Sequence, residues 1–321
     1  MPIVNCVGHL ERAKLAKVMS KKPAKKAESK IAVVIATRGR PDIVAATVKR
    51  LLDQSLVPDH IYVIGSQASD IAMLKPIKSR LTTLVGRVGS AHQRNDGLAL
   101  TGKRYDIIVF FDDDFIPSHY WIERMAEVFD TKGDVVGLSG IILDDGTKTA
   151  GINVSDADAM VKRQDREVGA TQKVSNSFAH GGNVGCNMAY RNSAIGSIRF
   201  DENLPRYAWL EDSDFRAQVE RKGYFARASD LWGVHLGHKH GRSSGVTLGY
   251  AQIANSVYLA RKGTVPKSYM ARMLIRNVAA NALKSLKPEP YVDRRGRFKG
   301  NMMALADFMR GRMNPNRILD L

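Results

Sequence analysis

The sequence predicts an α/β fold in which a mainly parallel sheet is flanked by helices. Short apolar runs typical of buried strands recur along the first third of the chain, and stretches with helical spacing separate them. Loops that contain Gly, Pro or Asp follow the apolar runs. Strands and helices that alternate at this spacing form βαβ units and a parallel sheet. The expected strands are residues 31–36, 61–64, 81–85 and 107–111.

Each expected helix follows one of these strands. Residues 42–54 carry Val44, Val48 and Leu51 at helical spacing. Further helices are expected over residues 70–80, 91–102 and 120–129, and a strand over 135–143. Residues 146–171 show no clear period and predict a loop over the site. In the last third, the pattern indicates helices over residues 211–222, 248–261, 267–286 and 301–312.

The most informative motif is Asp112-Asp113-Asp114, which directly follows the apolar run at residues 107–111. Three adjacent carboxylates repel one another unless a cation neutralises them. Carboxylate ligands suit Mn²⁺ or Mg²⁺. In an extended segment Asp112 and Asp114 point to the same side. The motif therefore predicts a divalent metal site at the carboxyl edge of the sheet, where ligands bind in such folds. The alternative is an Asp-rich turn that caps the next helix.

The charge of the chain is concentrated at its two ends. Of the net charge of +17, residues 1–30 contribute +6 and residues 261–321 contribute +10, counted from Lys/Arg and Asp/Glu. We expect a basic N-terminal extension (1–30), a catalytic domain (31–245) and a basic helical C-terminal region (246–321). Cationic ends favour an anionic membrane surface, while nucleic acid is not the expected partner.

The two cysteines, Cys6 and Cys186, form no disulfide framework or zinc spacing, and this fits a reducing compartment. There is no apolar run of about 18 residues that would predict a transmembrane helix. We therefore expect a cytoplasmic protein, peripheral at the inner membrane face.

Five segments between about residues 31 and 240 resemble, in their order, the motifs of the family-two glycosyltransferases of the GT-A fold. They are Ala36-Thr37-Arg38-Gly39-Arg40-Pro41, Gln93-Arg94-Asn95-Asp96-Gly97, Phe111-Asp112-Asp113-Asp114, Asn187-Met188-Ala189-Tyr190-Arg191 and Leu210-Glu211-Asp212-Ser213-Asp214-Phe215. The resemblance implies transfer of one sugar, with inversion, from a nucleotide-diphosphate donor to a glycan or lipid-linked glycan in polysaccharide biosynthesis.

The resemblance also implies roles for individual residues. Asp212 would be the general base, with Glu211 beside it to hold or orient the acceptor. Asp114 would bind the metal directly, and Asp112 would contact the ribose or the metal. Donor contacts are expected from Thr37, Arg38, Arg40, Ser66, Arg94, Asp112 and Asp113, and acceptor contacts from Asn187, Trp209 and Glu211.

The match has departures. The stretch from Ile64 to Asp70 lacks the acidic pair that this family often uses to bind a uracil ring. A UDP-sugar is still the expected donor, but these residues leave the choice of nucleobase open. The Gln-x-x-Arg-Trp box of processive synthases is absent, which favours transfer of a single sugar.

Histidines cluster at His235, His238 and His240, beside Lys239 and Arg242. Two roles compete for such a cluster, a further metal ligand or a cationic clamp on the diphosphate. We expect His235 to contact the metal or a phosphate.

Two other classes of protein compete with the glycosyltransferase interpretation. A nucleotidyltransferase also uses an α/β sheet and carboxylate-bound metal, but the chain lacks a Lys/Arg-rich, Gly-rich loop after the first strand. A nucleic-acid-binding protein would explain the pI near 9.9. Its charge should lie on a reading helix or sheet, and here it lies at the ends.

Overall fold

The computed structural model describes residues 29–77, 79–169, 178–180, 185–239 and 244–321. In these residues nine strands form one sheet, with the order β3-β2-β1-β4-β8-β6-β9-β5 and with β7 paired to β9. The strands are β1 (Ile31–Thr37), β2 (His60–Gly65), β3 (Leu81–Val85), β4 (Ile107–Asp112), β5 (Phe115–Pro117), β6 (Val135–Asp145), β7 (Phe178–His180), β8 (Asn187–Arg191) and β9 (Tyr224–His235).

The direction of the strands sets the position of the site. Strands β3, β2, β1 and β4 are mutually parallel, and β6 and β9 run in the same direction because both β4 and β6 are antiparallel to β8. Strands β5 and β7 run the opposite way. The predicted α/β class with a mainly parallel sheet is therefore confirmed. The carboxyl ends of β1, β2, β4, β6 and β9 all reach one edge.

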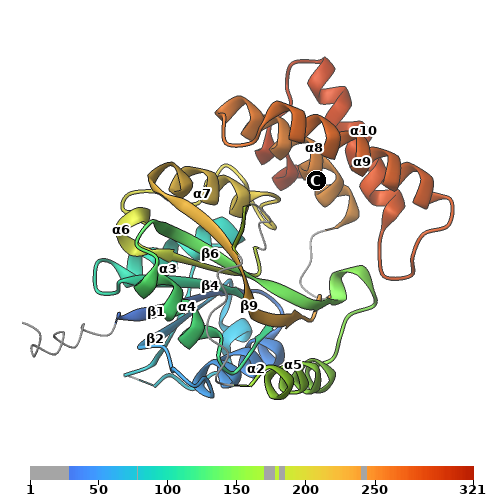
Figure 1. Cartoon of the computed structure of the whole chain (residues 1–321). Helices are drawn as coiled ribbons and strands as arrows, with labels where there is room; N and C mark the ends of the chain where they lie inside the picture. The colour runs from blue at the N-terminus through green and yellow to red at the C-terminus, as the bar shows by residue number, and fades with distance from the viewer. Residues whose placement is uncertain (1–28, 78, 170–177, 181–184, 240–243) are drawn as a thin grey trace, which may run out of the picture.

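Helices cover both faces of the sheet (Figure 1). In β1, Val33 and Ile35 pack against α2 (Pro41–Leu52) and α4 (Trp121–Thr131), while Ala32 and Val34 belong to the core on the other face. That second face is covered by α3 (Ser90–Thr101), α6 (Asn192–Ile195) and α7 (Glu211–Val219). Alternate residues of a strand point to opposite faces, so a fully apolar strand such as β1 needs both layers.

Two predicted elements before residue 171 were wrong. The helix expected over residues 70–80 is only the short 3₁₀ helix η1 (Ala68–Ile71), because Pro76 cannot sit inside a helix. The loop expected over 146–171 contains η2 (Gly146–Lys148) and α5 (Val154–Val168). Helix α5 buries Ala157, Val161 and Asp165, so one of its three buried positions is polar and the apolar period is weak.

Strand β9 was not predicted, and the last helix was predicted too short. The chain passes through η3 (Glu220–Lys222) directly into β9, whose sequence mixes polar and apolar residues. Helix α10 (Arg294–Met309) begins seven residues earlier than expected, where Asp293 accepts a hydrogen bond from the Gly296 amide as its N-cap. Its first turns are basic and Gly-containing, so they carry no helical apolar pattern.

The C-terminal region is a cluster of helices beside the sheet (Figure 1). It comprises α8 (Gly245–Lys262), α9 (Lys267–Ser285), α10 and η4 (Pro315–Asp320). Helices α8 and α10 approach closely at Gly249 and Gly300, where an added Cβ would lie 2.0 Å from the Arg297 carbonyl oxygen and 2.1 Å from that of Val246. Any larger side chain at either position would push the helices apart.

Helix α8 also joins this cluster to the sheet, since Leu259 packs into the core of the α3 and α7 face. The division into three parts stays a prediction, because residues 1–28 lie outside the described residues and α8 belongs to both cores. Within the described residues, none of the helices has the length and apolar character needed to span a bilayer.

Candidate active site

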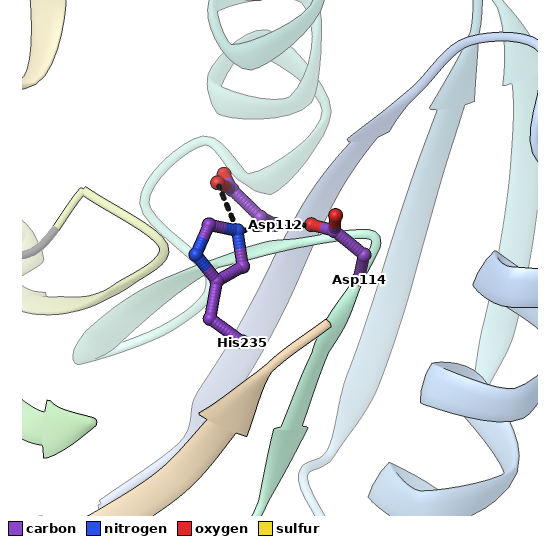
Figure 2. A group of neighbouring side chains, drawn as sticks. All are labelled: Asp112, Asp114 and His235. Carbon is purple, nitrogen blue, oxygen red and sulfur yellow. Dashed lines mark ion pairs between the residues drawn. The ribbon is translucent and has the colours of Figure 1, made fainter. Parts of the chain in front are cut away.

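Three strands end in the residues that form the centre of the site. Asp112 ends β4, Asp145 ends β6 and His235 ends β9. The strand register places His235 opposite Asp145 on one side and opposite Phe115 on the other. Asp114 immediately precedes Phe115, so it also lies beside His235. Figure 2 shows Asp112, Asp114 and His235 pointing toward one another.

Asp112, Asp114 and His235 form a group suited to a divalent cation. The His235 Nε2 atom lies 3.2 Å from Asp114 Oδ1 and 3.9 Å from Asp112 Oδ2. The three potential ligand atoms all lie within 4.8 Å of one another. Ligands at about 2.1 Å around an octahedral ion are about 3 Å apart, so small movements would close the group around Mn²⁺ or Mg²⁺. The imidazole nitrogen favours Mn²⁺ over Mg²⁺.

Asp145 orients His235 from behind. The Asp145 Oδ1 atom lies 3.2 Å from His235 Nδ1, which leaves Nε2 facing the aspartates. A carboxylate on the second nitrogen of a metal-binding histidine is a recurring arrangement that fixes the ring. Burial would lower the pKa of His235, but hydrogen bonds to Asp114 and Asp145 outweigh it and raise that pKa to about 10. A cation bound here would displace the proton from Nε2.

Asp113 points away from this group and stabilises the loop. Its carboxylate accepts a hydrogen bond from Thr37 Oγ1 at 2.7 Å and pairs with Arg40 Nη2 at 2.7 Å. Both Asp113 and Thr37 are buried. Both side chains hold the β1 loop against the aspartate motif, and the donor contacts expected of Thr37 and Asp113 stay predictions.

Arg40 binds the aspartate motif in the described structure. Its second terminal nitrogen, Nη1, lies 2.8 Å from Asp114 Oδ2, which also accepts a hydrogen bond from the His238 amide at 3.0 Å. Arg40 thus balances the charge of the Asp113 and Asp114 carboxylates. Its expected donor contact stays a prediction and would involve the exposed part of its side chain. Arg38 is exposed and remains an expected donor contact. His240 lies outside the described residues.

The His235 segment is held against the end of β6. Gly237 has φ +64°, and a Cβ there would lie 2.1 Å from the backbone of Gly146 and Thr147. Lys239 Nζ donates to the carbonyl oxygens of the same two residues. The segment after β9 is therefore fixed at the rim of the site by close backbone contact that only glycine allows.

Asp70 organises the loop after β2, the stretch that lacks the acidic pair of the motifs that the sequence otherwise resembles. Its carboxylate accepts hydrogen bonds from the Ser66 amide and hydroxyl, at 2.8 and 2.7 Å, and from the Gly39 amide at 2.8 Å. Burial would raise the pKa of Asp70, but these hydrogen bonds lower it. The Ser66 hydroxyl is thus committed to Asp70, and Ser66 stays an expected donor contact only through its other atoms.

Arg94 connects the metal-type group to the acidic motif on α7. Its Nη2 atom lies 2.8 Å from Asp112 Oδ1 and its Nη1 atom lies 2.6 Å from Glu211 Oε1. Arg94 and Glu211 are both buried, so their ion pair is shielded from water, while Asp112 is partly exposed. The sequence predicts a donor contact for Arg94, which stays a prediction; its described contacts are with Asp112 of the aspartate motif and Glu211 of α7.

Glu211 and Asp212 differ in accessibility. Glu211 is 7% exposed and accepts hydrogen bonds from Arg94 and from Ser90 Oγ at 2.9 Å. Burial, with the neighbouring Asp212, raises the pKa of Glu211 against the opposing effect of Arg94. Asp212 is only partly buried, and the Ser213 amide donates to its Oδ1 atom. In the described residues the Glu211 carboxylate binds Arg94 and Ser90, and its expected contact with the acceptor stays a prediction.

The segment before α7 carries unusual backbone strain. Arg206, Ala208 and Leu210 all have positive φ, at 59°, 50° and 72°. Non-glycine residues rarely adopt this conformation, and such outliers concentrate at functional sites. The Arg206 carbonyl accepts a hydrogen bond from the Ser90 amide, so the strained segment lies against the start of α3.

Asn187 and Trp209, the other two residues expected to contact the acceptor, make contacts inside the protein. Asn187 is 0% exposed, and its Oδ1 atom accepts a hydrogen bond from the Gly140 amide at 2.6 Å. Trp209 is partly buried and packs on the α8 and α10 core, while its carbonyl accepts from Asn255 Nδ2. The Asn187 amide is fully buried in the described residues, and its expected contact with the acceptor stays a prediction. For Trp209 the core packing limits such a contact to its exposed edge.

Comparison with known proteins identifies the family. The model of glycosyl transferase family 2 matches residues 32–199, just over half of the 321 residues. The chain belongs to this family. This family-2 protein is a glycosyltransferase with a GT-A fold, and the nucleotidyltransferase and nucleic-acid alternatives are not supported. Among curated proteins, no sequence matches it.

Solved structures of similar fold agree with this assignment. The mannosyltransferase PcManGT from Pyrobaculum calidifontis, in complex with GDP-Man and Mn²⁺, aligns with a TM-score of 0.51 at 15% identity, over 97% of this chain and 92% of that chain. Residues 1–349 of S. aureus TarS align with a TM-score of 0.51 at 13% identity, over 88% and 92% of the two chains. At these identities the likeness concerns the fold of the family-2 chain.

Proposed function

We propose that this family-2 glycosyltransferase moves one sugar, with inversion, from a UDP-sugar to a glycan or lipid-linked glycan in polysaccharide biosynthesis, with Mn²⁺ or Mg²⁺ held by Asp112, Asp114 and His235. The observation that carries the proposal is the convergence of these three side chains at the carboxyl edge of the sheet. Arg94 joins Asp112 to Glu211, the neighbour of the partly exposed Asp212. The cytoplasmic face of a membrane as the place of action is part of the same proposal.

Asp212 acts as the general base. The acceptor hydroxyl oxygen attacks the anomeric carbon on the face opposite the diphosphate, and Asp212 takes the hydroxyl proton as the new bond forms. The diphosphate leaves with the electron pair of the broken sugar–oxygen bond. The bound cation would stabilise the negative charge on the leaving diphosphate.

Arg94 links the proposed metal site to the segment that carries the proposed base. One guanidinium holds Asp112 at the metal side and Glu211 beside the base. The base and the donor are therefore positioned by a single buried side chain, which favours the alignment that an in-line displacement needs.

The donor is tested by a thermal-shift panel of UDP-, GDP- and dTDP-sugars, each with and without Mn²⁺. A ligand that binds only the folded protein raises its melting temperature. We expect the largest rise for a UDP-sugar with Mn²⁺. A GDP-sugar is included because the mannosyltransferase of similar fold was solved with GDP-Man.

The panel is repeated with the Asp114→Asn variant, which removes one charge from the metal group. We expect this variant to lose the rise that depends on Mn²⁺. A GDP- or dTDP-sugar that gives the largest rise would overturn the UDP assignment. If every donor raised the melting temperature equally with and without Mn²⁺, the proposed role of the metal would be overturned.

A further inference from the structure

Helix α9 presents an apolar stripe to the outside of the molecule. Ile275, Leu283 and Leu286 are 71%, 71% and 83% exposed, and exposed Ala279 lies between them. Their spacing of four, four and three residues places them on one side of the helix. The buried residues of α9, Met273 and Asn281, lie on the opposite side. The stripe is therefore a continuous face without a partner in the described residues.

Cations border this stripe. Arg272 and Arg276 lie on the exposed side of α9, and Lys287 follows its last turn. The chain contains no Asp or Glu from residue 231 to residue 288. The apolar face is thus surrounded by positive charge, and on α9 itself no acidic residue offsets it.

A second apolar surface, a groove, lies near the end of the stripe, where the last turn of α9 meets α10. It has a volume of about 500 Å³ and a floor of Phe298, Met302, Met303 and Ala306. Arg295 and Lys299, both exposed, stand at its rim. The groove reaches Ser285, which is adjacent to Leu286 of the stripe. Apolar surface with cations at its edge therefore extends over both helices.

We propose that this face of α9 and α10 docks on an anionic lipid bilayer. Apolar side chains would enter the boundary between headgroups and acyl chains, while Arg272, Arg276, Arg295 and Lys299 contact lipid phosphates. The charge argues against the other partners. A second copy of the chain would bring like charges together, and the phosphate backbone of a nucleic acid would leave the apolar stripe exposed to water.

Docking here would hold the active site near the membrane. Tyr291, in the loop between α9 and α10, donates a hydrogen bond to the Lys148 carbonyl and lies under the Lys239 ammonium, 5.3 Å from its ring centre. Lys148 and Lys239 belong to the two segments at the rim of the site. The docking goes beyond the proposed sugar transfer and does not depend on it.

The test is sedimentation of the full-length protein with vesicles at about 0.1 M salt. Equal parts of phosphatidylglycerol and phosphatidylcholine are compared with phosphatidylcholine alone. The charge variant is Arg272→Gln with Arg276→Gln, and the apolar variant is Ile275→Ser with Leu283→Ser and Leu286→Ser. Matched controls are Lys103→Gln with Arg163→Gln, and Met73→Ser, all exposed positions on other elements.

We expect binding to the anionic vesicles that weakens with salt. The charge variant should bind about 30-fold more weakly, since each cation near an anionic leaflet contributes a factor of about five. The apolar variant should lose at least about tenfold. The controls should keep wild-type binding, and all variants should keep the wild-type melting temperature because the changed side chains are exposed.

Other results would overturn the proposal. Equal weakening in the control pair would show an effect of net charge alone. Unchanged binding by the apolar variant would leave only electrostatic adhesion, without docking of this face. Absence of vesicle binding, together with binding of a single-stranded RNA that only the charge variant loses, would assign the face to nucleic acid. A dimer in solution that the apolar variant abolishes would assign it to a second copy of the chain.

Discussion

Adjacent aspartates at the end of β4 differ in what they contact, because Asp113 and Asp114 lie in the turn between β4 and β5, where the backbone changes direction. Asp112 and Asp114 face His235, while Asp113 faces Thr37 and Arg40. The same separation appears in α7, where Glu211 binds Arg94 and Asp212 stays partly exposed. At the scale of single residues, a motif of like side chains thus contains groups that differ in their contacts and in their exposure.

The Asp212→Asn variant should lose about 100-fold to 10,000-fold in kcat, because the amide cannot take the acceptor proton. The measurement is the steady-state rate of transfer from the donor that the thermal-shift panel selects. Donor binding, read as the same thermal shift in the variant, serves as the control. Transfer at near wild-type rate would remove Asp212 as the base.

The pH profile gives an independent check on the same residue. Burial raises the pKa of Asp212 above its usual value, and a base works only when it is deprotonated. The kcat/KM of the wild type should therefore increase with pH through this raised pKa, at a higher pH than an ordinary Asp would give. A wild-type profile that rises at no higher pH than an ordinary Asp would give would contradict the assignment.

The Asp145→Asn variant should bind Mn²⁺ about 10-fold to 100-fold more weakly, because Asp145 orients His235 without being a ligand itself. The readout is calorimetric titration of Mn²⁺ into the protein without donor. Asp144→Asn is the matched control, since Asp144 is the exposed neighbour of Asp145. Similar losses in both variants would mean that general charge, and not the contact with His235, governs the affinity.

At the scale of secondary-structure elements, the site depends on segments whose buried positions are partly polar. Asp165 of α5 accepts hydrogen bonds from Ser118 Oγ at 2.6 Å, the His119 amide at 2.9 Å and Trp232 Nε1 at 2.8 Å. These contacts join α5 to the end of β5 and to β9. Because β5 and β9 carry Asp114 and His235 at their ends, α5 supports the metal-type group from a distance.

The Asp165→Ala variant should be destabilised by about 3 kcal/mol, because three buried donors and the nearby Arg50 lose their acceptor. Urea unfolding measures the loss as a shift in the midpoint with an unchanged slope. Glu167→Ala, at an exposed position of the same helix, should change stability by less than about 0.5 kcal/mol. An equal midpoint for both variants would show that the Asp165 contacts contribute little.

At the scale of the whole molecule, one lysine links the C-terminal helices to the catalytic sheet. Lys262, the last residue of α8, has its Nζ atom 2.6 Å from Asp201 Oδ2 and 2.8 Å from Asp214 Oδ2. Asp214 belongs to α7, the helix of the proposed base, and is fully buried. The position of the helical cluster and the order of α7 are therefore coupled through buried charge.

The Lys262→Met variant should be destabilised by about 3 kcal/mol, because the buried Asp214 carboxylate loses its cation. Adding Asp214→Asn to this variant should recover part of the loss, since the uncompensated charge is then removed. Chemical denaturation of both proteins is compared with Lys267→Met, an exposed position that should change little. No recovery in the double variant would mean that the lysine acts by packing instead of charge.

The sequence by itself determined the parallel half of the sheet, the Asp112–Asp114 motif at its carboxyl edge and the acidic motif at residues 211–214. These features are local, because an apolar strand and the charged residues that follow it are adjacent in the chain. Only the tertiary structure decided that His235 lies between Asp145 and Asp114, and that Arg94 spans Asp112 and Glu211. Strand pairing and burial join Asp145 to His235, 90 positions apart, and Arg94 to Asp112 and Glu211, 18 and 117 positions away. No periodicity in the sequence records which of the like side chains turns toward the site.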